Sequence, residues 1–187
     1  VFDEMGDNVY DDELRYMREE GRKYWQSQWY ETNVMWYNPA ITYTPWAKTA
    51  DLDFGNAHPD LPRAHPHPDI NAQTLDLDET SSTVDGVVIN HARYYIKDGD
   101  TVYLVLLKEG DIDYYKLTGT DTGTIGTDLA EKVTTLASVV IETTDDIWPE
   151  RKDCGADPET VETCDYDDER QNFANWFSYH SRREFVA

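Results

Sequence analysis

The sequence lacks the motifs that most readily identify a function. It contains no Gly-x-Ser-x-Gly, no His-Glu-x-x-His and no phosphate-binding glycine loop, which are signatures of common hydrolases, metalloproteases and nucleotide-binding proteins. Carboxylate pairs are present, but among 38 Asp and Glu in 187 residues such pairs arise by chance and single out no glycosidase site. Nothing in the sequence itself therefore points to an enzyme.

Long apolar runs are also missing. The longest, Val102–Leu107, is far shorter than the roughly 20 residues that a membrane-spanning helix needs. The first residues, Val1–Glu4, have neither the basic region nor the apolar run of a secretory signal. We predict no membrane insertion and expect a mature exported protein or an internal piece of one.

Positive charge is scarce. Only 16 Lys and Arg face the 38 acidic residues, giving a formal net charge of −22. Such a chain repels phosphate groups, so we predict no nucleic-acid partner and no anionic membrane surface. A salty environment or an acidic secreted surface explains the charge best. Calcium or another divalent metal stays open with unknown ligands, because Asp51–Asp53, Asp76–Glu79 and Asp165–Glu169 lack the spacing of a calcium loop and suit helix capping or surface charge.

Cysteine is limited to Cys154 and Cys164. Structural zinc needs four ligands, and no Cys-x-x-Cys or nearby His completes such a set. A disulfide and a reduced, buried pair both remain open from the residues alone. Three histidines, His58, His65 and His67, are each followed by proline. Proline holds the backbone extended, so these side chains should splay apart in a surface loop and not converge on a metal.

Aromatic residues are plentiful, with 6 Trp, 13 Tyr and 5 Phe, which indicates a packed globular core. The pattern of apolar residues and turn residues predicts the elements in order. These are a helix over 11–30, an extended segment over 33–46, a loop-rich stretch over 47–83, a meander of three antiparallel strands within 84–118, a flexible connection over 118–127, a short helix over 128–137, a strand over 138–143 and a closing helix from about Asp165.

Three blocks of the sequence carry a resemblance to a known family. Asp153-Cys154 and Cys164-Asp165-Tyr166 lead into the run Glu169–Tyr179, and an earlier block spans Tyr37–Trp46. With a weaker third block at Ala92–Tyr95, this order resembles the PilY family of type IV pilus tip-associated adhesins and biogenesis factors. The residues of the closing helix that mark the resemblance are Arg170, Gln171, Asn172, Phe173, Asn175 and Trp176.

The resemblance implies a fold, a pairing and a place. It implies that Cys154 and Cys164 form a disulfide. It implies an α+β fold in which an antiparallel β-meander insertion, flanked by helices, forms part of a von Willebrand factor A-like α/β domain. Its parts would be an N-terminal helix and extended segment (1–46), a loop- and β-rich insertion (47–145) and a disulfide loop with an aromatic helix (146–187), together one structural unit and a fragment of a longer protein. The metal loop of such domains, Asp-x-Ser-x-Ser, is absent from these residues, so no metal ligand is assigned.

The function implied is that of a non-enzymatic, extracellular bacterial component at the pilus tip, serving adhesion, pilus biogenesis and surface sensing. Its partners would be minor pilins and a surface or host ligand. Two alternatives remain: a self-assembling acidic filament or matrix subunit, and an acidic secreted glycosidase with two facing carboxylates. Within the closing helix, Phe173, Trp176, Phe177 and His180 share one face. We interpret that face as core and the helix as a structural marker, with the contact surface in the insertion.

Overall fold

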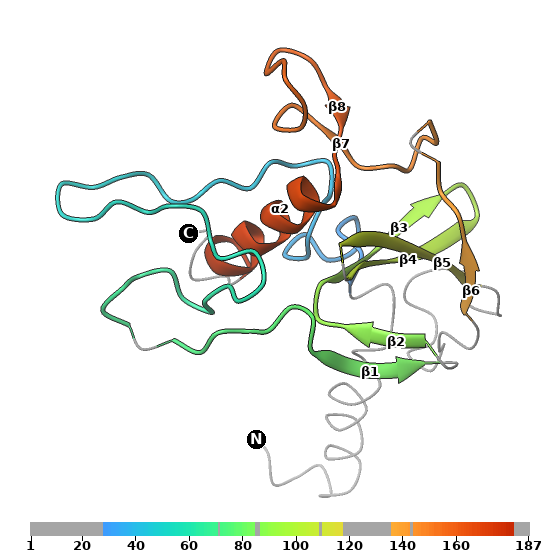
Figure 1. The fold of residues 1–187 in the computed structure, drawn as a ribbon, viewed down its shortest axis with the longest axis horizontal. Coiled ribbons are helices and arrows are strands. Elements are labelled where there is room, and N and C mark those ends of the chain that lie inside the picture. The colour runs from blue at the N-terminus through green and yellow to red at the C-terminus, as the bar shows by residue number, and fades with distance from the viewer. Residues whose placement is uncertain are drawn as a thin grey trace, which may run out of the picture.

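The structure is a computed structural model that describes residues 28–70, 72–84, 87–108, 110–117, 136–142 and 144–181. It is a mixed α/β fold with three antiparallel sheets and one α-helix in the described residues (Figure 1). Three of the expected segments lie wholly or mostly outside the described residues. They are the helix expected over 11–30, the connection expected over 118–127 and the helix expected over 128–137.

The central sheet has four strands in the order β3-β4-β5-β6. Each neighbouring pair is antiparallel, with Asp98 opposite Thr101 and Lys108 opposite Asp111 at the two hairpin ends. Gly99 and Gly110 adopt positive φ values of 56° and 87° in these turns, which a residue with a Cβ rarely tolerates. The strands are β3 (Arg93–Asp98), β4 (Thr101–Lys108), β5 (Asp111–Leu117) and β6 (Leu136–Val139). The three-stranded meander expected from the sequence is therefore present. The further strand expected over 138–143 is present as β6, but it begins earlier and overlaps the expected range only at Ser138 and Val139.

Two smaller pairings were not expected. The stretch predicted to be loop-rich ends in β1 (Thr80–Val84), which pairs with β2 (Val87–Asn90). A two-residue pair, β7 (Glu150–Arg151) with β8 (Glu162–Thr163), closes the cysteine loop. The short helix predicted over 128–137 is wrong at its last two residues, because Leu136 and Ala137 pair with Leu117 and Lys116 as part of β6. Cross-strand pairing with β5 overrides the helical spacing there.

Both faces of the central sheet are buried. Side chains alternate along β4, so Val102, Leu104 and Leu106 face one core cluster while Val105 and Leu107 face another. The first cluster includes Trp29 and Ile89. The second cluster packs against the helix, and its strand residues are Tyr94, Ile96, Val105, Leu107, Ile112 and Tyr114. A strand that is buried on both faces carries apolar residues at successive positions, which explains the continuous apolar run Val102–Leu107.

The helix, α2 (Tyr166–Tyr179), begins where the sequence predicts. Asp165 caps it: the carboxylate of Asp165 accepts the amide of Asp168, and the carboxylate of Asp168 accepts the amide of Asp165. Phe173 and Trp176 are buried in the core, as predicted, whereas Phe177 and His180 are only half-buried. Two long loops extend from one end of α2 toward the same side of the molecule (Figure 1).

Candidate functional site

A charged pair lies in the interior at the start of α2. The guanidinium of Arg151, on β7, bonds the carboxylate of Glu169, and the two side chains are 1% and 0% exposed. The hydroxyl of Tyr37 donates to the same carboxylate at 2.7 Å. Arg151 also donates to Asp153 at 3.0 Å and to the carbonyl of Pro39 at 3.1 Å. Burying two charges is costly, and it is tolerated only when hydrogen bonds satisfy most of their atoms, as they do in this cluster.

Burial and the negative charge of Glu169 shift the pKa values of the residues around it. Burial, reinforced by the negative charge of Glu169, raises the pKa of Tyr37 and of Tyr94 well above the usual value. The same two causes raise the pKa of Tyr114, whose hydroxyl has no hydrogen-bond partner among the described residues. Burial lowers the pKa of Arg151, but the charge and hydrogen bond of Glu169, together with Tyr37 and Asp153, outweigh the effect of burial, so the pKa of Arg151 is raised. The arginine therefore stays charged and the tyrosines stay neutral in the physiological range.

Two asparagines of α2 hold the extended segment by its backbone. The side chain of Asn172 accepts the amide of Tyr43 at 2.7 Å and donates to the carbonyl of Ile41 at 2.8 Å. One turn further on, Asn175 donates to the carbonyl of Tyr43 at 2.9 Å and accepts the amide of Ala57 at 2.9 Å. The two carboxamides thus replace the strand partner that this segment does not have. This is why asparagine occurs twice, three residues apart, on a buried helix face.

Arg170 and Gln171 extend these contacts. The Arg170 side chain is 1% exposed and donates to the carbonyls of Pro59 at 3.1 Å and Leu107 at 2.7 Å. It also forms an ion pair with Asp78 at 2.8 Å. Gln171 donates to the carbonyl of Ala57 at 2.8 Å. One arginine therefore links the helix to β4 and to both ends of a loop.

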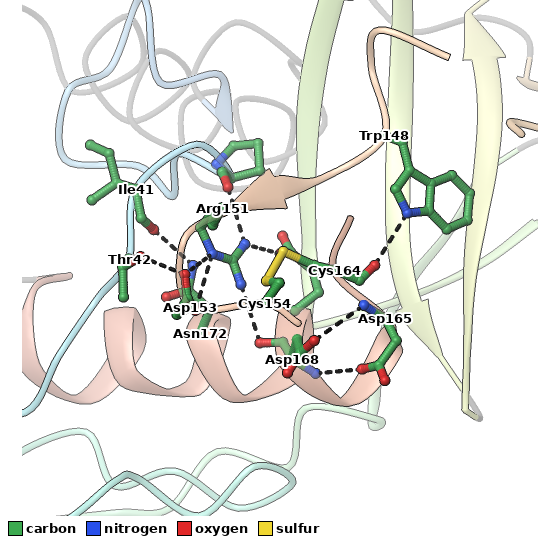
Figure 2. Close-up of a disulfide and its surroundings, with 12 residues drawn as sticks. Ile41, Thr42, Trp148, Arg151, Asp153, Cys154, Cys164, Asp165, Asp168 and Asn172 are labelled. Atoms are coloured by element: carbon green, nitrogen blue, oxygen red, sulfur yellow. Dashed lines mark hydrogen bonds and ion pairs between the residues drawn. A yellow bond between two sulfur atoms is a disulfide. The ribbon is translucent and has the colours of Figure 1, made fainter. Parts of the chain in front are cut away.

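The cysteine loop is fastened beside this cluster. Cys154 and Cys164 are fully buried and joined by a disulfide, with Cα atoms 4.9 Å apart. Figure 2 shows the bridge between Arg151 and the capping residue Asp165. The indole of Trp148 donates to the carbonyl of Cys164 at 3.2 Å. The bridge thus holds Arg151 and the first turn of α2 together.

The marker residues of the closing helix are therefore all engaged within the protein. Phe173 and Trp176 lie 5.0 Å apart between ring centroids, and the Trp176 indole donates to the carbonyl of Met35. The part played by Arg151 and Glu169 is missed from the sequence alone, because Glu169 is interpreted there only as one of the acidic residues at the start of the helix. A signal did exist, because Glu-Arg-Gln-Asn is unusually polar for a helix flanked by so many aromatic residues.

A pocket of about 290 Å³ lies at the C-terminal end of α2, where residues of the two long loops complete its lining. Ser178 and Tyr179 of the helix form part of its lining, together with Phe54 and Gly55 of one loop and Arg63 of the other. The hydroxyl of Ser178 is buried without a hydrogen-bond partner among the described residues. A second pocket, of about 230 Å³, lies beside Trp148 and Ile96.

Metal-binding groups do not gather in the described residues, where no three His, Cys, Asp or Glu could hold an ion. The loop histidines are used locally: Nδ1 of His58 and of His67 each accepts a backbone amide two residues further on. No helix among the described residues is long and apolar enough to span a membrane. In comparisons with known proteins, no family model, no curated protein and no solved structure matches the chain.

Proposed function

We propose that this chain is part of a type IV pilus tip-associated adhesin and biogenesis factor resembling the PilY family. In this proposal it is a non-enzymatic, extracellular segment of a von Willebrand factor A-like domain, and it contacts minor pilins and a surface ligand. The disulfide loop and α2 form the rigid base of the segment. The loops that α2 holds provide its contact surface.

One observation carries the proposal. The three blocks that resemble the family are far apart in the sequence, yet they contact one another in the structure. The ring of Tyr37, from the block Tyr37–Trp46, lies 5.0 Å from the ring of Tyr94 in the block Ala92–Tyr95, centroid to centroid. It lies 5.1 Å from the ring of Phe173 in the closing helix. Asn172 bonds the backbone of Ile41 and Tyr43. A resemblance carried by separate blocks is more meaningful when the blocks pack into one cluster, because blocks that match a family by chance need not lie close together in the fold.

The residues of this cluster also support a structural role over a catalytic one. The buried carboxylate of Glu169 is bonded by Arg151 and Tyr37. The two asparagine side chains bond the backbone of the extended segment. A nucleophile or general base needs a free lone pair facing a substrate. The groups of this cluster are spent on internal bonds, which suits a module that holds its shape.

The proposal predicts where the protein is found on the cell. An antibody raised against the purified chain should label the ends of surface filaments in immunogold electron micrographs of intact bacteria that carry the parent gene. Bacteria lacking that gene are the control and should show no label, fewer filaments and reduced attachment. Label distributed evenly along filaments would instead favour the acidic filament subunit, and label confined to the cytoplasm would refute both.

Deleting the whole insertion, residues 47–145, would not be a suitable test of its role as the contact surface. Tyr94, Val105 and Leu107 lie within residues 47–145 and belong to the same core cluster as Phe173 and Trp176. Removing them would expose the helix and unfold the base. A sharper deletion replaces residues 64–73 with a short Gly-Ser turn, because Arg63 and Thr74 already bridge as an antiparallel pair. This variant should be secreted normally and attach less.

A further inference from the structure

The pocket at the end of α2 has the form of a ligand site. Its lining comes from α2 and from two loops that project to the same side of the molecule (Figure 1). We call residues 44–58 the first arm, and the described residues 59–70 and 72–77 the second arm. The second arm is closed along its length by backbone hydrogen bonds from Ala64 to Gln73, from Leu75 to Pro62 and from Leu77 to Asp60. The pocket therefore lies between two defined segments.

The helix end of the pocket is held in place by contacts within the protein. The Tyr179 hydroxyl donates to the carbonyl of Gly55 at 2.6 Å, which ties the first arm to the helix. Trp46 packs edge-on against Phe54 and Tyr179, which are both lining residues. These contacts fix the positions of two aromatic rings at the pocket.

The lining of the pocket combines two kinds of side chain. The apolar ones are Leu52, Phe54, Leu61, Pro66 and Pro68. The polar ones, which supply both donors and acceptors of hydrogen bonds, are Asp53, Asn56, His58 and Arg63. The volume of about 290 Å³ lies at the small end of ligand pockets. A compact ligand with apolar C–H faces and a surrounding set of hydroxyl groups matches both kinds of side chain.

We propose that this pocket binds one neutral pyranose ring, a single sugar unit of a glycan. A neutral ligand is favoured because the two charged side chains of the lining are already bonded within the protein, Asp53 to Lys48 at 2.6 Å and Arg63 to the carbonyl of Ile70 at 2.6 Å. The net charge of −22 disfavours an anion as well. A peptide is disfavoured because the pocket has room for one ring and not for an extended run of residues. The inference rests on the proposed function for its biological meaning, since it names the class of surface ligand that such an adhesin would contact.

Saturation-transfer NMR on the purified, oxidised chain tests the inference with a defined set of probes. These are the methyl glycosides of glucose, galactose, mannose and N-acetylglucosamine, with glucuronic acid, N-acetylneuraminic acid and a polyproline peptide as competing classes. At least one neutral glycoside should show transfer that a higher concentration of the same sugar competes away. Transfer to the acidic sugars alone, to the peptide alone or to no probe would each overturn the inference.

Position 55 offers a matched pair of variants that assigns the binding to this pocket. A Cβ added at Gly55 meets nothing within 4 Å, so substitution there fills the pocket without displacing the protein. Gly55→Leu should abolish transfer, whereas Gly55→Ala makes the same backbone change with little bulk and should retain it. Equal transfer in the two variants, with both folded by circular dichroism, would place the binding elsewhere and overturn the assignment.

The outcome is separable from the proposed function: filament-tip labelling together with no sugar transfer would sink only the sugar site, and transfer without tip labelling would sink only the pilus assignment.

Discussion

The buried pair of Arg151 and Glu169 makes the sharpest prediction about stability. Replacing Arg151 with Met keeps an unbranched side chain of similar length but leaves the Glu169 carboxylate, which is 0% exposed, without its cation. The carbonyls of Pro39 and Asp168 lose a donor as well. Removing one partner of a buried ion pair costs about 3–5 kcal/mol. Domains are stable by only roughly 5–15 kcal/mol, so Arg151→Met should lose a large part of the total.

Urea denaturation followed by tryptophan fluorescence measures the loss. The matched control is Lys48→Met, which removes the ion pair between Lys48 and Asp53, two side chains that are 68% and 70% exposed. This substitution should lower the free energy of unfolding by about 1 kcal/mol or less. A second variant, Arg151→Met with Glu169→Leu, removes the orphaned charge and should recover part of the loss. The reasoning is refuted if Arg151→Met lowers the free energy of unfolding by no more than Lys48→Met does. It is also refuted if the double variant is clearly less stable than Arg151→Met alone.

Three further predictions concern the same region. Tyr114→Phe removes a buried hydroxyl with no described partner and should leave the free energy of unfolding unchanged or higher, whereas Tyr37→Phe removes hydrogen bonds to Glu169 and Asn172 and should lower it by about 1–3 kcal/mol, both read from urea curves at pH 7. Burial raises the pKa of Tyr37 and Tyr114 in the folded state, so the stability that these neutral tyrosines provide is fully present below the unfolded pKa near 10. It is lost as the pH rises above that value, by about 1.4 kcal/mol per pH unit for each tyrosine. The same titration of Tyr114→Phe should show a shallower slope, and a free energy of unfolding that does not change up to about pH 11 would contradict the assignment. Reducing the bridge between Cys154 and Cys164, which are 10 residues apart, should cost about 3 kcal/mol in the free energy of unfolding, and equal urea midpoints with and without reductant would show that the bridge does not constrain the chain.

Local features of the fold could be predicted from the sequence. The hairpins at Gly99 and Gly110 follow from glycine after Asp or Glu between strand-forming runs, and the start of α2 follows from Asp165 and the acidic first turn. The pairing of β1 with β2 was missed because Thr80–Val84 is short and polar. Leu136 and Ala137 were assigned to a helix because their spacing is helical, but β5 supplies a strand partner.

The interior of the candidate site could not be predicted in the same way. Arg151 and Glu169 are 18 residues apart, and Tyr37 bonds Glu169 across 132 residues. Only the folded chain brings them together. Charged residues are almost always at the surface, so a sequence rule that places Glu169 in solvent is right for most proteins and wrong here. The asparagines show the same limit, because nothing local indicates that Asn172 and Asn175 bond a backbone segment more than 100 residues away.

The way α2 holds the arms bears on how a contact surface can vary. The helix side chains bond backbone atoms at the ends of the arms. These atoms are the amide and carbonyl of Tyr43, just before the first arm, the amide and carbonyl of Ala57, and the carbonyl of Pro59. Backbone groups are the same for nearly every residue type, so these bonds fix the position of the arms without specifying most of their side chains. The side chains between the fixed points, which include most of the pocket lining, are not specified by these bonds. A base that binds the main chain of two arms, and leaves their side chains replaceable, is an arrangement by which one scaffold can present different contact surfaces.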